Sequence, residues 1–412
     1  MFRFQRLHVQ NYRCFEDVEL PLENDLTVLF AENGGGKTAL LTGLAMGIAV
    51  FQPGSPKELK LDALRDTRKT AMGDGRQREP AGSCTISWRA TVDSVRTVDW
   101  GVTVNPASGR RTNRTRAILD AIEAIRLPGA RWPLFAWYGT ERMMNGHRRG
   151  RSTREARDRW DGYAASLDPS IIDTPLLDWL EREVLGDLVR QRHNEPERRF
   201  DEGVMAALVR ATPGLTEAWY DPVERGPVAR FEDGHVAPWS ELSDGFHVFL
   251  GLVADIARRA FLLNESDGKR AAELIEGVVL IDEIDLHLHP RWQRVVLEGL
   301  RKAFPTVQLV VTTHSPQVLS SVENRQVRRL VNGRLDEHAV FVEGRDSNAI
   351  LRELMHTDDR DEEGVQALRK LHDAIDQGRK DEAEGLYREL LARWGDLDPE
   401  LIRARGLMDW EI

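Results

Sequence analysis

Three short runs consist mainly of apolar residues, at 26–30, 278–281 and 307–311, and a helical stretch at 291–304 separates the last two. Runs of this length without polar alternation are typical of strands buried on both faces. A strand–helix–strand order favours parallel pairing, because the crossover helix returns the chain to the same end of the sheet. We therefore predict an α/β fold around a parallel sheet.

The remaining apolar pattern is mostly helical. Residues 246–260 predict a strongly apolar helix, and residues 39–49 have a helix-forming composition. Beyond residue 348, two apolar stripes at helical spacing flank Gly378 and predict a helical hairpin. The stripes consist of Val365, Leu368, Leu371 and Ile375, and of Ala383, Leu386, Leu390 and Trp394. We expect the hairpin to pack on the rest of the chain, with a partner-binding surface as the alternative.

The segment from about residue 52 to residue 235 is less regular. Residues 85–88 and 100–104 alternate like strands, and residues 117–125 suggest a helix. Stretches rich in arginine interrupt these elements. The chain has no internal repeat and no sustained heptad pattern, which argues against long coiled-coil arms.

Composition and charge narrow the class of protein. The 412-residue chain is 41% hydrophobic and 30% charged, with a formal net charge of −10, so attraction of its whole surface to nucleic acid is not expected. Its two cysteines, Cys14 and Cys84, provide no disulfide framework. No apolar leader opens the sequence, and its longest apolar runs, such as residues 43–51, are too short to span a bilayer. We expect a soluble cytoplasmic protein with no membrane partner.

A glycine-rich loop follows the first buried strand and precedes a helix. Residues 31–38 read Ala-Glu-Asn-Gly-Gly-Gly-Lys-Thr and depart from the phosphate-loop pattern only at Ala31, where a small residue is tolerable because backbone amides form the cradle. We expect Lys37 to reach the β- and γ-phosphate oxygens and the Thr38 hydroxyl to bind Mg²⁺. The residues predicted to bind nucleotide here are Asn33, Gly34, Gly35, Gly36, Lys37 and Thr38. A glycine-rich turn without nucleotide is the alternative, but the flanking strand and helix are the context that a phosphate loop requires.

Two further positions suit phosphate chemistry. Asp282 and Glu283 end the run at 278–281, where Asp282 is expected to hold Mg²⁺ and Glu283 to act as the general base on the attacking water. An acidic cap is the alternative. Ser243 and Gly245 stand at the start of the apolar helix and predict a second phosphate clamp, which closes on a different nucleotide from the one that Lys37 binds. A plain helix N-cap is the alternative there.

These motifs resemble the nucleotide-binding head of ABC-type ATPases. Residues 242–245, Leu-Ser-Asp-Gly, resemble the signature motif, and in that family two heads sandwich ATP between the phosphate loop of one and the signature of the other. The resemblance implies that His314 contacts the γ-phosphate and that Asp285 lies in the loop crossing the dimer interface. Residues 11–15 are similar to the N-F-R-x-F element of the RecF and SMC branch, which lies near the nucleotide. This implies a nucleotide contact for Arg13, although which of Tyr12, Arg13 and Phe15 touches adenine stays open.

Within the RecF/SMC/OLD-like branch, the chain is similar to stand-alone ATPases of bacterial anti-phage defence such as the Septu ATPase. The matching stretches are residues 136–142, 242–245, 282–290 and 312–317. The resemblance implies hydrolysis of ATP with Mg²⁺, with Glu283, Lys37 and His314 as catalytic residues, in a homodimer or a higher oligomer. The expected domains are an ABC-type head with a mixed or parallel sheet (1–51 and 236–345), an α+β insertion (52–235) and a C-terminal helical hairpin (346–412).

The expected role is a dimeric ATP-driven switch that controls a separate effector protein, such as a nuclease or another toxic enzyme. A RecF-like DNA-binding ATPase of DNA repair and an ATP-dependent scaffold are the alternatives. Residues 340–346 resemble the opening of a Toprim nuclease, but the further acidic pair on a strand that this chemistry needs does not follow them. His287 and His289 lack a third zinc ligand nearby and are expected to shape the interface loop instead.

Seven arginines lie between residues 142 and 159, diluted by Glu155 and Asp158. A solvated loop is the simplest interpretation of this segment. The alternative is a phosphate-contacting surface for DNA, RNA or a nucleotide signal.

Overall fold

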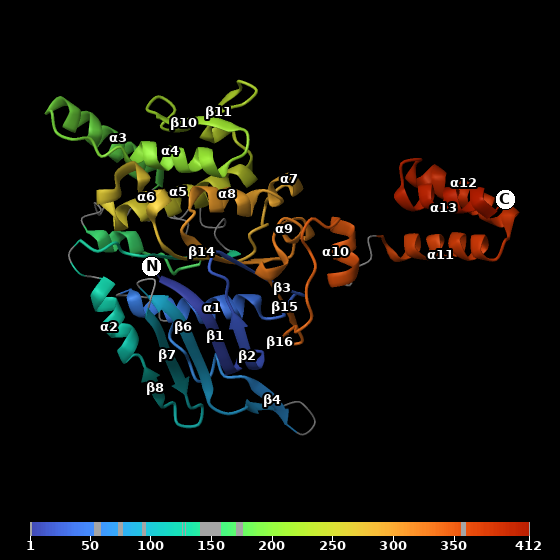
Figure 1. The fold of residues 1–412 in the computed structure, drawn as a ribbon, viewed down its shortest axis with the longest axis horizontal. Coiled ribbons are helices and arrows are strands. Elements are labelled where there is room, and N and C mark those ends of the chain that lie inside the picture. The colour runs from blue at the N-terminus through green and yellow to red at the C-terminus, as the bar shows by residue number, and fades with distance from the viewer. Residues whose placement is uncertain are drawn as a thin grey trace. The chain divides into compact units, whose positions relative to one another are not determined.

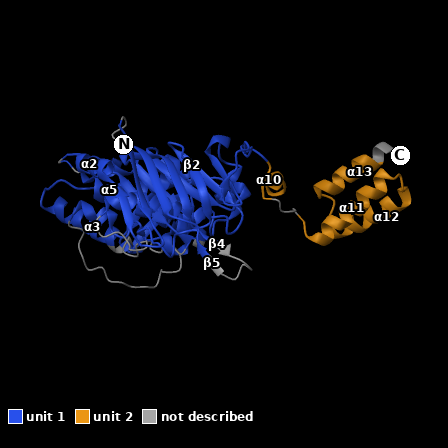
Figure 2. Cartoon of the chain, turned by 90° about the horizontal axis from the view of Figure 1, so that it is seen from below, with its two compact units in different colours: residues 1–345 blue, residues 346–412 orange. Residues whose placement is uncertain are grey.

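The computed structural model describes residues 2–52, 59–72, 77–92, 96–125, 127, 129–140, 158–169, 176–355 and 360–411. The chain forms two compact units, residues 1–345 and residues 346–412 (Figure 2). Among the described residues, no helix is both long and apolar enough to cross a membrane.

A six-stranded sheet lies at the centre of the first unit, in the order β16-β15-β3-β14-β13-β9. Its strands are β3 (Leu26–Ala31), β9 (Leu134–Tyr138), β13 (Gly277–Ile281), β14 (Val307–Thr313), β15 (Val327–Val331) and β16 (Arg334–Leu335). Neighbouring strands are parallel except β15 and β16. β3, β13 and β14 are buried along their whole length, because layers cover both faces of the sheet. The predicted α/β class with a mixed or parallel sheet is confirmed.

An antiparallel sheet of five strands, in the order β2-β1-β6-β7-β8, belongs to the same unit. Its strands are β1 (Phe2–Tyr12), β2 (Phe15–Pro21), β6 (Cys84–Val92), β7 (Arg96–Val104) and β8 (Arg111–Arg114). Gln308 of β14 joins the two sheets, since its buried side-chain amide accepts the N–H of Phe4 (2.8 Å) and donates to the Phe4 carbonyl (2.7 Å). Both polar ends of a buried amide are thereby satisfied, which fixes the two sheets against each other.

Helices cover the central sheet on both sides (Figure 1). α1 (Lys37–Ile48) contacts both sheets, and Trp88 of β6 donates to the Gly43 carbonyl on this helix (2.8 Å). α4, α5 and α8 lie on the opposite side of the central sheet from α1. Besides α1, the described α-helices of the first unit are α2 (Arg116–Ile125), α3 (Leu176–Arg192), α4 (Phe200–Ala211), α5 (Asp244–Leu263), α6 (Ala271–Leu274), α7 (Pro290–Gln293), α8 (Val296–Ala303) and α9 (Pro316–Leu319).

The segment 52–235, expected as an insertion, contributes to both sheets. β6, β7 and β8 complete the antiparallel sheet, and β9 pairs in parallel with β13. The rest of the segment includes β4 (Lys69–Met72) and β5 (Gln77–Pro80), which form one small sheet. It also includes β10 (Leu215–Asp221) and β11 (Gly226–Phe231), which form a second small sheet with β12 (Val236–Pro238), a strand just beyond the segment. The head is therefore completed by strands that lie between its two expected sequence segments.

The helix predicted at 291–304 is divided into α7 and α8. Val295 donates its N–H to the Trp292 carbonyl (3.1 Å), three residues back, so the turn tightens there instead of continuing the α-helical bonding. The two short helices still form the crossover between β13 and β14 that the sequence predicts.

The second unit is entirely helical in its described part. It contains α10 (Ser347–Leu354), α11 (Glu362–Asp376), α12 (Lys380–Trp394) and α13 (Pro399–Glu411). α11 and α12 form the predicted hairpin around Gly378, whose φ is 65°. Except for Val365, the residues of the predicted apolar stripes belong to one packed cluster with Leu401 and Ala404 of α13. The hairpin is therefore part of a three-helix packing arrangement with its own core.

Candidate active site

The glycine-rich loop joins β3 to α1. Gly34 and Gly36 have φ angles of 77° and 92°, a conformation that glycine adopts without strain. A Cβ on Gly36 would lie 2.4 Å from Phe15 Cζ and 2.6 Å from Cys14 Sγ. The position therefore needs glycine both for its conformation and for close contact with the β1–β2 turn. α1 begins directly after Gly36, so its free N-terminal amides adjoin the loop, an arrangement that favours anions.

The ends of three parallel strands bring the separate motifs together. Thr313 of β14 pairs with Phe30 of β3, and Val311 of β14 pairs with Ile281 of β13. Because the strands are parallel, the residues that follow them lie at one edge of the sheet. The phosphate loop, Asp282 and the segment around His314 consequently share this edge.

Asp282 is held by hydroxyl groups from the two neighbouring motifs. Thr38 Oγ1 donates to Asp282 Oδ2 (2.7 Å), and Thr312 Oγ1 donates to Asp282 Oδ1 (2.5 Å). The aspartate is only 3% exposed, so such donors are needed to stabilise its charge. The Thr312 hydroxyl also accepts the N–H of Glu283 (2.7 Å). One hydroxyl group therefore positions both residues of the acidic pair.

No individual role for Thr312 follows from the sequence. The motif at residues 312–316 stands out there, but a threonine that ends a strand is also an ordinary β-residue. Only the pairing of β13 with β14 places its hydroxyl between the two acidic residues.

Replacing Thr312 with valine is expected to reduce the turnover rate for ATP about 10-fold. The change keeps the side-chain shape and removes the hydroxyl, and partners of a metal-binding carboxylate typically contribute 10–100-fold. Steady-state ATPase assays at saturating ATP measure the effect. Thr312→Ser is the control, because it retains the hydroxyl; equal rates for the serine and valine variants would contradict the assigned role.

Glu283 has a backbone conformation that is uncommon for its residue type. Its φ is 48°, in the left-handed region that side chains other than glycine rarely occupy. Strained backbone of this kind persists where the surroundings hold it, and it concentrates at functional sites. The bond from its N–H to Thr312 is one such constraint. Glu283 thus lies beside the phosphate loop in a conformation that the sheet edge imposes.

Lys37 lies among the acidic groups of the site. Its ammonium group donates to the carbonyls of Ala31 (3.0 Å) and Glu32 (3.3 Å), which brings it back over the loop. Burial lowers the pKa of Lys37, and the charges of the carboxylates at 282, 283 and 285 partly offset this. Carbonyl groups are weak partners for an ammonium ion compared with phosphate, so a triphosphate would compete well for this side chain.

Asp285 and His314 lie at the same edge. Thr313 Oγ1 donates to Asp285 Oδ1 (2.6 Å), which anchors the loop after the acidic pair to β14. Burial lowers the pKa of His314, and the positive charge of Lys37 lowers it further against the opposing effect of the three carboxylates. A lowered pKa favours the neutral ring, in which one nitrogen can donate a hydrogen bond and the other can accept one.

The pKa of His314 is expected to be lower than is usual for histidine in the wild type and to rise when Lys37 is replaced by methionine. Part of the shift comes from the Lys37 charge, and methionine removes that charge at similar length. NMR titration of the histidine rings checks this. Lys302→Met is the control, because Lys302 is an exposed residue paired with Glu298; no difference between the two variants would contradict the assignment.

Ser243 and Gly245 are on the other side of the central sheet from α1, at the start of α5 (Figure 1). Ser243 is exposed and its side chain makes no N-capping hydrogen bond, so the simple N-cap alternative receives no support. A Cβ on Gly245 would lie 2.7 Å from the His287 carbonyl oxygen. Gly245 therefore allows α5 to approach the loop that follows the acidic pair.

Arg13 lies beside α1. Its Nε donates to Asp66 (3.1 Å) and its Nη1 to Thr42 Oγ1 (3.3 Å). Asp66 is fully buried and also accepts from Arg65 (2.6 Å). The nucleotide contact of Arg13 stays a prediction. Asp66, for which the sequence predicted no role, fixes the orientation of this arginine.

Other predicted features lie partly outside the described residues. The arginine-rich segment does so except for Asp158 and Arg159, and Arg159 donates to the backbone carbonyls of Leu263 (2.6 Å) and Ala130 (2.9 Å). The described stretch at 340–346 contains no strand. His289 accepts the N–H of Arg291 (3.3 Å) as the N-cap of α7.

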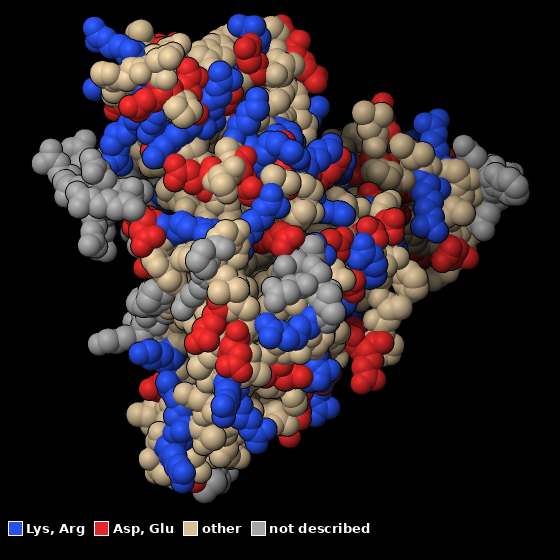
Figure 3. Space-filling view, turned by 60° about the vertical axis from the view of Figure 1, so that its left-hand side comes forward, with Lys and Arg blue, Asp and Glu red and all other residues tan. Residues whose placement is uncertain are grey.

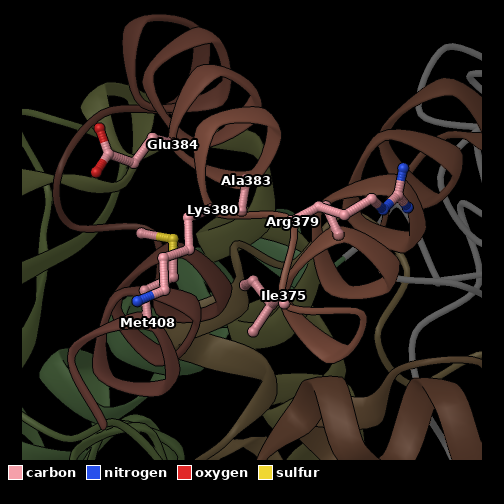
Figure 4. A pocket seen from close by; sticks show the side chains of 8 residues that line it. Ile375, Arg379, Lys380, Ala383, Glu384 and Met408 are labelled. Atoms are coloured by element: carbon pink, nitrogen blue, oxygen red, sulfur yellow. The ribbon is translucent and has the colours of Figure 1, made fainter. Parts of the chain in front are cut away.

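Figures 3 and 4 show the charged side chains on one face of the molecule and a cleft in the second unit. On the face drawn in Figure 3, Lys and Arg are interspersed with Asp and Glu over the described surface. A small cleft lies in the second unit, between the α11–α12 turn and Met408 (Figure 4). None of the predicted nucleotide-binding residues lines it.

A parallel sheet with a glycine loop on one strand, an acidic pair on another and a histidine motif on the strand between them defines an ABC-type P-loop ATPase head. Residues 82–320, more than half of the chain, match the family described as "AAA domain, putative AbiEii toxin, Type IV TA system", and the chain belongs to this family. The prediction of an ATPase is confirmed.

The chain is also similar to two individual proteins and to one solved structure. The "Retron Ec83 probable ATPase" of Escherichia coli is 26% identical over 87% of this chain and 77% of its own length. The Septu protein PtuA of Bacillus mycoides is 37% identical over 27% of this chain and 13% of its own length. The SMC head domain from Thermotoga maritima has a TM-score of 0.47 at 14% identity, covering 82% of this chain and all of that one. The predicted resemblance to ATPases of anti-phage defence is confirmed by the retron and Septu relatives.

Proposed function

We propose that the chain is a dimeric ATP-driven switch in bacterial anti-phage defence. Mg²⁺ would be held by Thr38 and Asp282, whose oxygen atoms suit an ion that uses few protein ligands and takes the rest from water and phosphate. Lys37 neutralises charge on the β- and γ-phosphates, Glu283 accepts a proton from the attacking water, and His314 contacts the γ-phosphate. The hydrolytic site in this proposal rests on one observation, the hydrogen-bonded chain Thr38–Asp282–Thr312–Glu283.

The second half of the composite site comes from a second copy of the chain. Ser243 and Gly245 lie across the sheet from the phosphate loop, so a clamp on the γ-phosphate would have to come from the partner's α5. ATP then joins two heads, and hydrolysis separates them. The signature resemblance and the exposure of Ser243 support this arrangement.

We infer that the output belongs to a separate effector protein. The retron and Septu relatives support a defence role. A nuclease or another toxic enzyme is the proposed effector class.

Affinity purification of Glu283→Gln from its native host with ATP tests the proposal. The variant is expected to retain the ATP-joined dimer and to capture a toxic enzyme, while Lys37→Ala is the control that cannot close on ATP. Recovery of nucleic acid without a protein partner would contradict the effector proposal and favour a DNA-binding ATPase of repair.

A further inference from the structure

A buried polar network connects the acidic pair to the helix that carries the clamp. Tyr138 ends β9, next to β13, and its carbonyl accepts the N–H of Asp282 (2.8 Å). The hydroxyl of the same tyrosine donates to Asp255 Oδ2 on α5 (2.8 Å). Tyr138 thus bonds through its backbone to the proposed magnesium ligand, Asp282, and through its side chain to α5, the helix at whose start Ser243 and Gly245 lie.

Asp255 is an ionised side chain in the interior. It is fully buried and accepts from Arg258 Nη2 (3.0 Å) and Arg259 Nε (2.7 Å). Burial acts to raise the pKa of Asp255, but the two arginines and the tyrosine hydroxyl outweigh it and lower the pKa to about 2. A carboxylate held this way has a fixed orientation, because each of its oxygens has a defined donor.

The network also reaches the chain that returns from the arginine-rich segment. Arg259 Nη1 donates to the carbonyls of Gly162 (3.1 Å) and Ala164 (2.9 Å), at the end of the short helix η4 (Arg159–Tyr163). Buried ion pairs rarely add stability over apolar packing of the same volume. The hydrogen bonds of this network hold β9, α5 and the residues around η4 in one defined arrangement.

α5 therefore contacts, at two points, residues that lie beside the acidic pair. Gly245 contacts the backbone of His287 near its first turn, and Asp255 contacts Tyr138 about three turns later. One continuous helix therefore connects the position of the clamp with Tyr138 and, through the carbonyl of Tyr138, with the backbone of Asp282.

We propose that Tyr138 and Asp255 are positioning residues that couple closure of the ATP dimer to the alignment of Asp282 for hydrolysis. The proposal rests on the proposed function, since it requires both a hydrolytic site at Asp282 and a clamp on α5. It concerns the turnover step and leaves the first binding of ATP to the phosphate loop unaffected.

Tyr138→Phe tests the coupling, because it removes only the hydroxyl and keeps the ring and the backbone bond to Asp282. The expected result is a kcat lowered about 10-fold, the range for groups that act through a metal ligand, with KM and the Kd for ATP within about twofold of wild type. Tyr163→Phe is the matched control, since it also removes a buried tyrosine hydroxyl, one that bonds to the Pro133 carbonyl. It is expected to keep the wild-type kcat.

A double variant separates coupling from general damage. Tyr138→Phe combined with Asp255→Asn is expected to be no slower than Asp255→Asn alone, because both changes break one link. Equal kcat for Tyr138→Phe and Tyr163→Phe, or additive losses in the double variant, would overturn the proposal while wild-type hydrolysis and dimerisation stand. Absence of hydrolysis or of ATP-dependent dimerisation in the wild type would overturn the proposed function and this inference together.

Discussion

Replacing Glu283 with glutamine is expected to lower the rate of ATP hydrolysis by about 10²–10⁴-fold, the contribution typical of a general base. Glutamine has nearly the same shape but accepts no proton from the attacking water. The left-handed backbone at this position and its bond to Thr312 do not depend on the carboxylate. ATP binding and ATP-dependent dimerisation should therefore persist, and the trapped dimer should be longer-lived than that of the wild type.

The expected outcome has two separate readouts. Phosphate release under saturating ATP measures the loss of turnover, and analytical ultracentrifugation with and without ATP measures the dimer. Glu343→Gln is the control, because Glu343 is exposed and lies outside the sheet edge. Turnover near the wild-type rate in Glu283→Gln would refute the general-base assignment, and loss of the dimer would indicate a structural role for the carboxylate.

Replacing Gly36 with alanine is expected to abolish ATP binding at concentrations that saturate the wild type. Its φ of 92° disfavours any side chain, with a cost of about 1–3 kcal/mol. The new Cβ would also meet Phe15 Cζ at 2.4 Å and Cys14 Sγ at 2.6 Å. Either the loop or the side chains of Phe15 and Cys14 would have to move, and a displaced loop would no longer direct its amides at one phosphate.

The matched control for this change is Gly251→Ala. Gly251 lies inside α5 and a Cβ there would meet nothing within 4 Å, so alanine should be neutral or slightly stabilising. Binding of a fluorescent ATP analogue and thermal unfolding of both variants measure the effects. Wild-type affinity in Gly36→Ala would show that the loop does not need its left-handed conformation to hold nucleotide.

The identity of the central elements could be predicted because their signals are local. The runs at 26–30, 278–281 and 307–311 are buried strands, since only residues covered on both faces of a sheet dispense with polar alternation. The glycine loop, the acidic pair and the histidine motif each adjoin one of these runs. The resemblance to ABC-type heads and the ATPase class, both confirmed, depend on these short stretches.

The pairing of distant segments was not accessible in the same way. β9 lies within the expected insertion, yet it is the strand that pairs with β13. The sequence of a five-residue strand does not indicate which other strand it pairs with. The second unit shows the same limit, because a hairpin pattern in α11 and α12 does not reveal that α13 completes their core.

The sequence by itself determined the class of protein and the residues of the phosphate loop, because these follow from residue type, order and spacing. Only the tertiary structure placed Thr312 between Asp282 and Glu283 and Tyr138 between Asp282 and Asp255. Such bonds depend on which strands are adjacent and in which register, and long-range contacts alone set that register. Residue type determined the available chemistry, while strand pairing decided which groups meet.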